Sequence, residues 1–417
     1  MTATAKKPAK PAKKPAKSPA IGEPSVAGLP IIARANALFE TIRDAGVDKS
    51  QNREFRYSHF ASLILLGFFN PMMQSLRGMQ QASQLESVQE KLDLRGVSLG
   101  SLSESSRVFD PDLLLPLIAQ RLAELGPHHS GPGPHRKGSE AIPETLARRL
   151  VAVDGSALKA LPRIVRGGSD WKLHLQFRTL TGQPHCATVA DGEDERDVFA
   201  ANLEAGCIYI ADRGYERYGL YNQIVSAKSD YVVRGKDRPH IVVESRPITD
   251  EGRAARVISD EIVTLSPTKS TTRAAKISHP VRRIVIAIRD RGRKRADRSA
   301  PEEIIILTSL LNVPVEWIAA IYELRWTIEL FFRFLKQVLR CHKLFSTKPN
   351  AITIQIYCAL IACLLLARMT GGRVRMDVFR MICFYMQGMA TMAELEAYLE
   401  KARLKEAKRA EAKLKET

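Results

Sequence analysis

Two aspartates occupy the same kind of place in this sequence. Asp154 ends an apolar run and precedes a Gly-Ser pair, and Asp212 ends a second apolar run and precedes an Arg-Gly pair. A carboxylate at the carboxyl end of a strand projects from the sheet edge into solvent, where a hard cation can bind it. Each aspartate taken alone could equally cap a turn, which is a common role for Asp before glycine.

A third acid lies in a pattern of helical spacing. Tyr322, Arg325, Glu329 and Lys336 stand at offsets 0, 3, 7 and 14, and Arg333 falls beside them. On a continuous helix these side chains occupy a stripe roughly 60° wide. The apolar residues lie on the opposite side: Leu324, Ile328, Phe331, Leu335 and Val338. A single glutamate among cations suits a metal ligand whose basic neighbours bind phosphates. The alternative interpretation of this charged stripe is an ordinary solvated helix face.

The elements that must position these residues alternate between strands and helices. Strands are expected at residues 149–154, 172–177, 185–189, 207–212 and 231–234, with helices near 194–204 and 220–228. The order is therefore β-β-β-α-β-α-β. Four further strand-like segments follow at 240–244, 257–265, 281–288 and 303–311, and a long helix starts at about Pro314. Three other acids, Asp191, Asp194 and Asp197, are better explained by capping of the first helix.

The first part of the chain reads as helical. From residue 33 to residue 125 apolar runs recur, and the run 60–69 is ended by Asn70 and Pro71. A glycine turn precedes Ser101 and Glu104, which have capping-box spacing and predict a helix start. This could be a helix-turn-helix that enters a major groove, or a plain helical packing module. The apolar run 351–367 is short of the roughly 20 residues that a spanning helix needs, so we expect a buried core helix rather than membrane insertion.

The charge of the chain is concentrated in two places. Lys and Arg number 63 against 45 Asp and Glu, a net charge of +18 on an otherwise globular composition. Residues 231–300 hold 17 bases and 8 acids, with a dense group at 289–298, and residues 1–20 hold six lysines and no acid. The tail is expected to be disordered. Such an excess indicates a polyanionic partner, either nucleic acid or a membrane surface.

The cysteines, the histidines and the N-terminal residues indicate in which cellular compartment the protein acts. The six cysteines form no C-x-x-C pair, so reduced thiols are expected rather than a zinc site or a disulfide framework. The three histidines between residues 127 and 135 lie in a Gly/Pro-rich linker without fixed ligand geometry. No apolar signal-peptide core is found at the N-terminus. A cytoplasmic, nucleoid-associated bacterial protein with no membrane partner is expected.

Here the pattern resembles a known family. The spacing Y-x2-R-x3-E-x6-K is similar to the defining motif of DDE transposases of the insertion-sequence-four type. Its four positions are Tyr322, Arg325, Glu329 and Lys336. The segments that end at Asp154 and Asp212 resemble those that carry the other two acids of that family. The acids are separated by 58 (212 − 154) and 117 (329 − 212) residues, the second interval enlarged by a β insertion typical of the family. The resemblance covers roughly residues 55–390.

The resemblance implies an α/β fold with a ribonuclease H-like catalytic core, interrupted by a mainly β insertion and preceded by an N-terminal helical domain. In it Asp154, Asp212 and Glu329 would be the catalytic acids and bind two Mg²⁺ ions, with Mn²⁺ as a substitute. DNA would be held by Tyr322, Arg325, Arg333 and Lys336. The expected divisions are a basic tail (1–30), a helical and DNA-binding domain (31–126), a linker (127–143), the first part of the core (144–239), the basic β insertion (240–311), the second part of the core (312–390) and a charged C-terminal helix (391–417).

The implied function is that of a transposase. It would bind the terminal inverted repeats of an insertion sequence, cleave double-stranded DNA and join the ends to target DNA, acting as a homodimer on DNA. Related transposases that pass through a DNA hairpin stack a tryptophan of the insertion on a flipped base, yet residues 231–311 contain neither Trp nor Phe. Tyr231 is the aromatic residue there that could substitute. The alternative function is a transposase-derived DNA-binding protein that does not cleave.

Overall fold

The structure is a computed structural model of the 417-residue chain. The residues that it describes are 39–40, 54–73, 75–125, 142–157, 171–266, 276–287, 303–339, 344–346, 348–369 and 376–414. The predictions for the basic tail, for most of the linker and for the arginine-rich group at 289–298 lie outside these residues.

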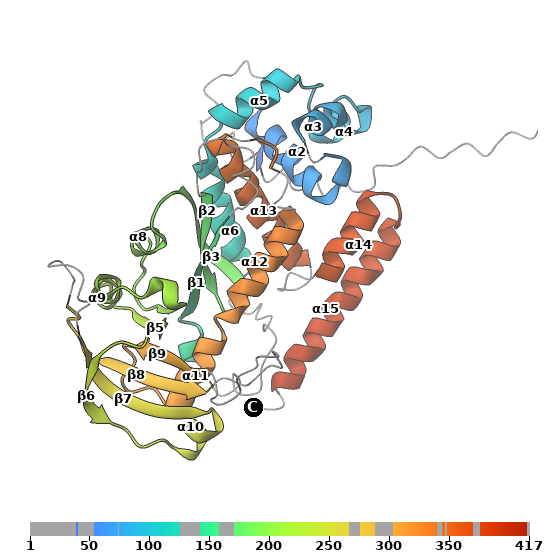
Figure 1. Cartoon of the computed structure of the whole chain (residues 1–417). Helices are drawn as coiled ribbons and strands as arrows, with labels where there is room; N and C mark the ends of the chain where they lie inside the picture. The colour runs from blue at the N-terminus through green and yellow to red at the C-terminus, as the bar shows by residue number, and fades with distance from the viewer. Residues whose placement is uncertain are drawn as a thin grey trace, which may run out of the picture.

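One mixed sheet runs through the left and lower-left part of the molecule in Figure 1, with helices above it and to its right. Within the described residues it has nine strands in the order β3-β2-β1-β4-β5-β9-β8-β7-β6. Their bounds are β1 (Leu150–Ala157), β2 (Trp171–Arg178), β3 (Gln183–Asp191), β4 (Ile208–Ala211), β5 (Asp230–Gly235), β6 (His240–Ser245), β7 (Val257–Leu265), β8 (Val281–Ala287) and β9 (Glu303–Thr308). Strands β1, β4 and β5 are parallel, and every other neighbouring pair is antiparallel.

The predicted order of elements is confirmed from the first strand to the fifth. Helices α8 (Glu195–Ala200) and α9 (Tyr218–Ser226) lie where helices were expected. The carboxylate of Asp194 caps α8 by accepting the amide N–H of Arg196 at 2.8 Å, as its sequence position predicted. One boundary differs: β1 does not end at Asp154, because the three residues that follow still pair with β2.

The insertion extends the same sheet rather than forming a separate one. Strand β9 pairs antiparallel with β5, and β8, β7 and β6 follow outward in turn. The four segments predicted as strands therefore contain strands, and in the part of the insertion that the structure describes a short helix, α10 (Asp250–Ala254), lies between β6 and β7. Core and insertion consequently share a continuous ladder of backbone hydrogen bonds.

Alternation along the strands sends side chains to two differently covered faces. Residues such as Val151, Tyr209 and Val233 pack with Tyr221 of α9 in one cluster. On the other face Ile208, Ile210 and Val232 pack with helix α11 (Val315–Glu323). The buried side of helix α12 (Trp326–Leu339) contacts β1 and β2; the ring centroids of Phe177 and Phe331 are 4.9 Å apart.

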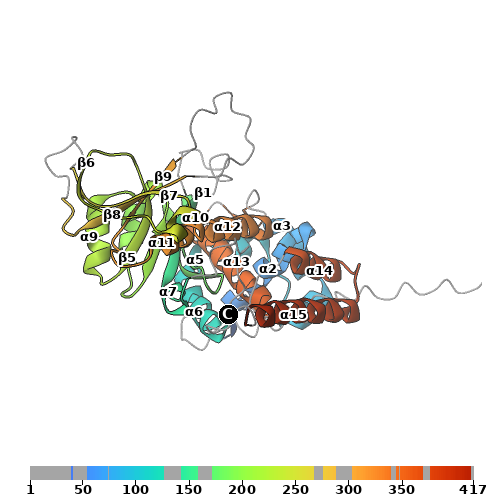
Figure 2. The same ribbon diagram turned by 90° about the horizontal axis from the view of Figure 1, so that it is seen from below.

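The N-terminal helices share a core with the last part of the chain (Figure 2). These helices are α2 (Tyr57–Phe69), α3 (Leu76–Ser83), α4 (Glu86–Leu92), α5 (Leu99–Val108) and α6 (Leu115–Leu125), with the short turns η1 (Pro71–Met73) and η2 (Pro111–Leu114). They surround α13 (Pro349–Met369), and α14 (Met376–Met386) and α15 (Met392–Leu414) complete the chain; α7 (Glu144–Ala147) precedes β1. Helix α2 ends at Phe69 as predicted. Helix α5 starts one turn earlier than predicted, because the hydroxyl of Ser98 rather than Ser101 accepts its first capping bond.

Helix α13 contains the apolar run 351–367, for which the sequence predicted a buried core helix rather than a membrane span. Its length and composition would suffice to cross a membrane, but 89% of its most apolar window is buried inside the protein. It is the central core helix that the sequence predicted. The described cysteines also follow the prediction: Cys186, Cys207, Cys358, Cys363 and Cys383 are free thiols.

Candidate active site

Register across the parallel strands brings three charged residues together. Ala152 of β1 and Ile210 of β4 are the last residues paired between these strands, and the same register continued by two residues puts Asp154 level with Asp212. Ala211 of β4 lies opposite Val233 of β5, so the next pair in line is Asp212 and Arg234. Since all three positions have the same parity, their side chains leave the same face of the sheet.

Asp154 is a half-buried carboxyl group among other charges. Burial, and then the negative charge of Asp212, raise its pKa from 3.8 to about 6. The charge of Glu329 acts in the same direction, whereas the amide N–H of Gly155, which donates to Asp154 Oδ1 at 2.9 Å, and the guanidinium of Arg325 oppose it. The charges of both other predicted acids, Asp212 and Glu329, therefore act on the carboxyl group of Asp154.

Asp212 follows β4 directly and starts a short turn, η4 (Arg213–Tyr215). Its Oδ1 accepts the amide N–H of Gly214 at 2.7 Å. The capping role that the sequence left open is thus present. This capping bond uses only Oδ1 of Asp212, and the carboxylate remains at the end of strand β4.

The acid-bearing helix is not continuous, which corrects the sequence prediction of one long helix. Helix α11 ends at Glu323 and α12 begins at Trp326, and between them Leu324 and Arg325 form a tight turn with i to i−3 backbone bonds. The hydroxyl of Thr327 donates to the carbonyl of Leu324 at 2.7 Å and stabilises this turn. Arg325 therefore projects from a bend rather than from a helix side.

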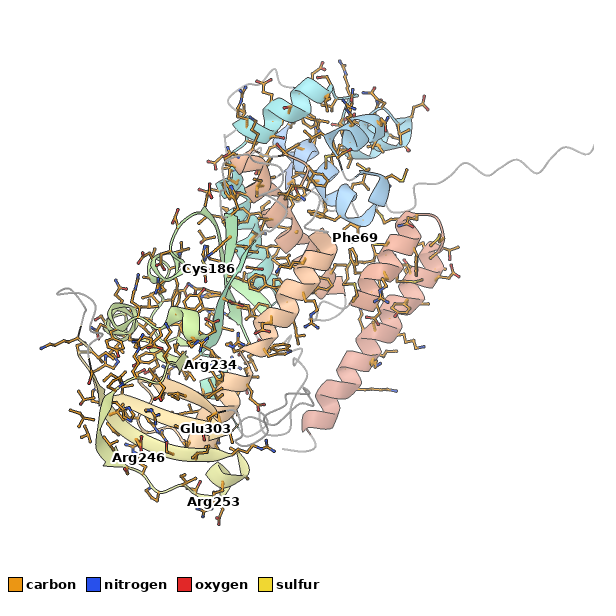
Figure 3. The ribbon with its side chains drawn as sticks, viewed as in Figure 1. Phe69, Cys186, Arg234, Arg246, Arg253 and Glu303 are labelled. Atoms are coloured by element: carbon orange, nitrogen blue, oxygen red, sulfur yellow. The ribbon has the colours of Figure 1, made fainter. Side chains whose placement is uncertain are left out.

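Tyr322, Arg325 and Glu329 meet at this bend. Arg325 Nη2 lies 2.6 Å from Glu329 Oε1, and its guanidinium stands 5.9 Å from the centre of the Tyr322 ring. Burial raises the pKa of Tyr322, and the positive charges of Arg325 and Arg234 oppose that rise. The charge of Arg234 is therefore close enough to act on Tyr322, and Figure 3 labels Arg234 where the sheet approaches α11 and α12.

The remaining two predicted phosphate contacts lie apart from this group. Arg333 and Lys336 are both exposed on α12, one and two turns beyond Glu329. Neither forms an ion pair with any other residue that the structure describes. Both side chains are therefore accessible to a ligand. Trp326, at the start of the same helix, is also exposed, with 44% of its surface accessible to solvent.

Sequence reasoning missed three residues near the acids. Arg234 is the next-to-last residue of β5, and the parallel register, continued by one residue, puts it beside Asp212. Tyr215 is fully buried, and burial followed by the charges of Glu195, Asp154 and Asp212 raises its pKa well above the usual value. Glu195 lies in the first turn of α8 and forms an ion pair with Lys172. The position of Arg234 at a strand end was the signal available in the sequence.

The suggestion that Tyr231 could stack on a flipped base is wrong. Tyr231 is fully buried in β5, where its ring stacks on Tyr221 with centroids 4.3 Å apart. Its hydroxyl lies 3.0 Å from the Nε2 atom of His279. A ring enclosed in this way has no face available to a base.

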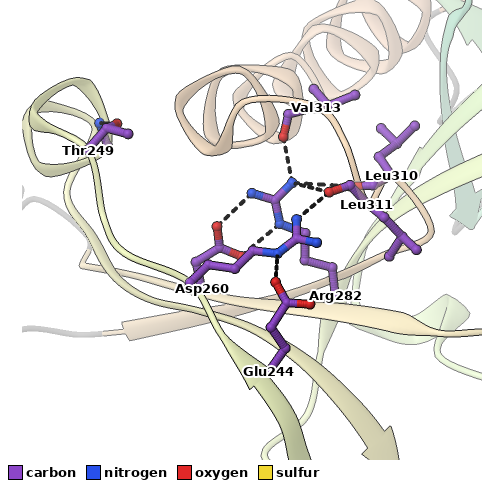
Figure 4. A network of polar contacts seen from close by, with 9 residues as sticks. Glu244, Thr249, Asp260, Arg282, Leu310, Leu311 and Val313 are labelled. Atoms are coloured by element: carbon purple, nitrogen blue, oxygen red, sulfur yellow. Dashed lines mark hydrogen bonds and ion pairs between the residues drawn. The ribbon is translucent and has the colours of Figure 1, made fainter.

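A buried ion pair holds the chain segment that leads into α11 (Figure 4). Arg282 of β8 contacts both carboxylate oxygens of Asp260 on β7, at 2.7 and 2.6 Å, and each side chain is only 4% exposed. The same guanidinium donates to the carbonyls of Leu310, Leu311 and Val313. The insertion therefore anchors the start of the helix that carries Tyr322.

The donors present suit a hard cation. Asp154, Asp212 and Glu329 offer only carboxylate oxygens, which favour Mg²⁺ or Mn²⁺ over zinc. Among the residues described, however, no three acidic, histidine or cysteine side chains converge closely enough to hold one ion. The ion pair with Arg325 occupies Glu329 instead. The chemistry of the donors therefore fits such an ion, and binding would require Glu329 to exchange partners.

Fold and site together define a class of protein: a mixed α/β chain that presents coupled carboxylates and arginines at the ends of parallel strands. Comparison with known sequences identifies the family. Residues 146–365, more than half of the chain, match the family described as transposase DDE domain, and the chain belongs to it. The predicted resemblance to DDE transposases is confirmed at this level.

Individual relatives agree with the family assignment. The chain is 32% identical over 216 residues to y4zB of Sinorhizobium fredii, which is named as a transposase; the match covers 50% of this chain and 56% of the relative. It is 27% identical over 252 residues to the transposase for insertion sequence element IS421 of Escherichia coli, covering 53% and 66%. The matches thus span between about half and two thirds of these relatives.

Among solved structures, the piggyBac transposase synaptic complex with hairpin DNA aligns with 92% of this chain and 85% of that chain. The TM-score of this alignment is 0.38 and the sequence identity is 12%.

Proposed function

We propose that this chain is an active transposase of the insertion-sequence-four type, with a ribonuclease H-like core. It would bind the terminal inverted repeats of its element, cleave the DNA strands and transfer the 3′-hydroxyl ends to target DNA. The observation that carries the proposal is the coupling of Asp154, Asp212 and Glu329 at the end of parallel strands, beside Arg325. The strand order β3-β2-β1-β4-β5, with β2 and β3 antiparallel and β4 and β5 parallel to β1, supports the proposed core.

The proposed cofactor is a pair of Mg²⁺ ions on Asp154, Asp212 and Glu329. When bound, two such ions activate an attacking oxygen and stabilise the leaving oxygen of an in-line displacement at phosphorus. The residues around them have separate tasks. Arg325 offers a planar fork to a phosphate, Arg234 and Lys336 add positive charge, and Tyr322 can donate its phenol hydrogen to a phosphate oxygen.

The proposed partner is double-stranded DNA. A net charge of +18 supplies attraction to phosphates that does not depend on sequence. Two ends of one element must be cut and joined together, so we propose a homodimer assembled on DNA, with the helices at 57–125 as a further contact to the element ends.

The decisive experiment replaces Glu329 by Gln. This change keeps the size of the side chain but removes the charge, so release of 3′-hydroxyl ends from the flanking DNA in Mg²⁺ should fall to background. Glu316 of α11 provides the matched control, because Glu316→Gln makes the same chemical change away from the acids. Cleavage by Glu329→Gln at the wild-type rate would remove Glu329 from the catalytic site.

One observation favours a second function, that of a transposase-derived DNA-binding protein without cleavage activity. The carboxylate of Glu329 is paired with Arg325, and among the described residues no three acids lie close enough together to hold one metal ion. A binding protein would retain DNA affinity in Glu329→Gln and show no cleavage in the wild type with Mg²⁺ or Mn²⁺. Inverted repeats that flank the coding sequence and are cut by the wild type would exclude it.

A further inference from the structure

A fourth carboxylate lies against the backbone next to Asp154. Gly155 has no side chain, and the place of its missing Cβ is taken by Glu195 of α8: a Cβ built there would stand 2.8 Å from Glu195 Cδ and 2.9 Å from Oε2. The backbone of Gly155 is outside the left-handed region, so what a side chain at this position would meet is the Glu195 carboxylate and not a conformational restriction.

Glu195 is fixed in this position from two sides. It belongs to the first turn of α8, which Asp194 caps. Its Oε1 lies 2.9 Å from Nζ of Lys172, on the neighbouring strand β2, and about two thirds of each side chain is shielded from solvent. The carboxylate is therefore a placed group rather than a mobile surface acid.

Glu195 is linked to Asp154 through the backbone of Gly155, which lies between them. The amide N–H of Gly155 donates to Asp154 Oδ1 at 2.9 Å. Pairing between β1 and β4 stops at Ala152, so the stretch that carries Asp154 is hydrogen-bonded to β2 alone. Glu195 packs on the opposite face of this stretch from Asp154, where it limits movement of the Gly155 backbone.

We infer that Glu195, held by Lys172 and seated on Gly155, is a positioning residue that fixes the backbone and the carboxylate of Asp154. The inference rests on the proposed function, because it concerns a proposed catalytic acid. It adds a residue outside the three acids and the helix motif, on the far face of the strand.

The test compares variants of Glu195 and Gly155. Glu195→Ser removes the carboxylate that rests on Gly155, and the resulting displacement of Asp154 should lower kcat on the order of 10- to 100-fold. Gly155→Ala places a methyl group 2.8 Å from Glu195 Cδ and should also lower kcat, but it should cause no further loss in the Glu195→Ser background, where that carboxylate is absent. KM for DNA should stay constant, because neither residue lies on the face of the sheet that carries Asp154. The matched control is Glu193→Ser, which shortens a nearby exposed glutamate and should leave kcat unchanged.

Direct binding of Mn²⁺, measured by calorimetry without DNA, gives a readout besides activity. Affinity should fall in Glu195→Ser and in Gly155→Ala, and it should be the same in the double variant as in Glu195→Ser. If Glu195→Ser binds Mn²⁺ and cleaves like the wild type, or if the two losses add in the double variant while all variants unfold at the wild-type temperature, Glu195 does not act through Gly155. If the wild type binds Mn²⁺ but never cleaves DNA, the proposed function is wrong. The Mn²⁺ affinities of the wild type and the variants would then still test whether Glu195 positions Asp154.

Should Gly155→Ala fail to fold, Lys172→Met tests the same connection without adding atoms to the strand. It releases Glu195 from its ion pair and should lower both kcat and Mn²⁺ affinity, whereas Lys172→Arg keeps the pair and should preserve them. Equal behaviour of the two Lys172 variants would overturn the inference.

Discussion

Asp154 combines burial with a neighbouring negative charge, and this makes the metal-free protein sensitive to pH. Its folded-state pKa of about 6 lies above the ordinary 3.8, so the folded chain binds this proton more tightly than the unfolded chain does. The contribution of the group to stability is therefore greatest below pH 4 and is lost as the pH rises through 6.

We expect Asp154→Asn to remove this dependence. With a chelator present, the free energy of unfolding of the variant should exceed that of the wild type by more at pH 7.5 than at pH 4.5, because Asn avoids the buried charge. Denaturant titration at both pH values measures the difference. A difference between variant and wild type that is the same at both pH values would show that Asp154 has no raised pKa.

Arg234 is predicted to contribute to the reaction through its charge. Its place beside Asp212 and opposite Tyr322 suits stabilisation of a phosphate near the acids, so Arg234→Met should lower kcat by about 10²-fold. Single-turnover cleavage of an end substrate measures this. Arg380→Met, which removes an exposed arginine of α14, is the control and should cleave normally.

Part of the candidate site could be predicted from the sequence, and the rest depends on strand register and packing. Asp154 and Asp212 are recognisable because each follows an apolar run. Arg234 follows one as well, yet its importance depends on the register between β4 and β5, which a single sequence does not contain. Glu195 belongs to another element altogether and reaches Gly155 only through the packing of α8 on the sheet.

Among the elements, the break between α11 and α12 is the largest departure from sequence-based expectation. Neither glycine nor proline marks it, so helical periodicity predicts one continuous helix. The break depends on local bonding, in which Leu324 gives its carbonyl to the Thr327 hydroxyl and the backbone tightens to i to i−3 bonds. As a result Arg325 reaches both Tyr322 and Glu329.

The link between the insertion and α11 leads to a stability prediction. Asp260→Ala should destabilise the protein by about 3–5 kcal/mol, because it leaves the Arg282 guanidinium buried without its partner. Asp250→Ala is the matched control. It breaks an exposed pair with Arg253 and should cost less than about 1 kcal/mol. Denaturant unfolding compares the two, and similar losses would mean that the Asp260–Arg282 pair is no anchor.

At the scale of the whole molecule, the distribution of charge predicts how DNA binding responds to salt. Residues 1–20 carry six lysines, so their removal should reduce the slope of log affinity against log salt concentration by at most about 5. Fluorescence anisotropy with a non-specific duplex between low and moderate salt measures the slope. An unchanged slope would show that the tail does not contact phosphates.

The fold as a whole was largely predictable, since the order of strands and helices follows from periodicity. Its least predictable feature is that the insertion joins the central sheet. Segments 257–265 and 281–288 read as strands in the sequence, but the same pattern would suit a separate β domain. The choice is made by β9, whose backbone pairs with β5 over Val232 to Gly235.

That arrangement also bears on how such a chain can change over evolutionary time. Strand β9 is joined to β5 on one side, whereas β6 forms the outer edge of the sheet. Gain or loss of a hairpin at the β6 edge would alter the size of the protein without shifting the alignment of Asp154, Asp212 and Arg234. A one-residue insertion within β9 would instead disturb the pairing that supports Arg234. Length variation among descendants of this chain should therefore accumulate at the far edge of the sheet.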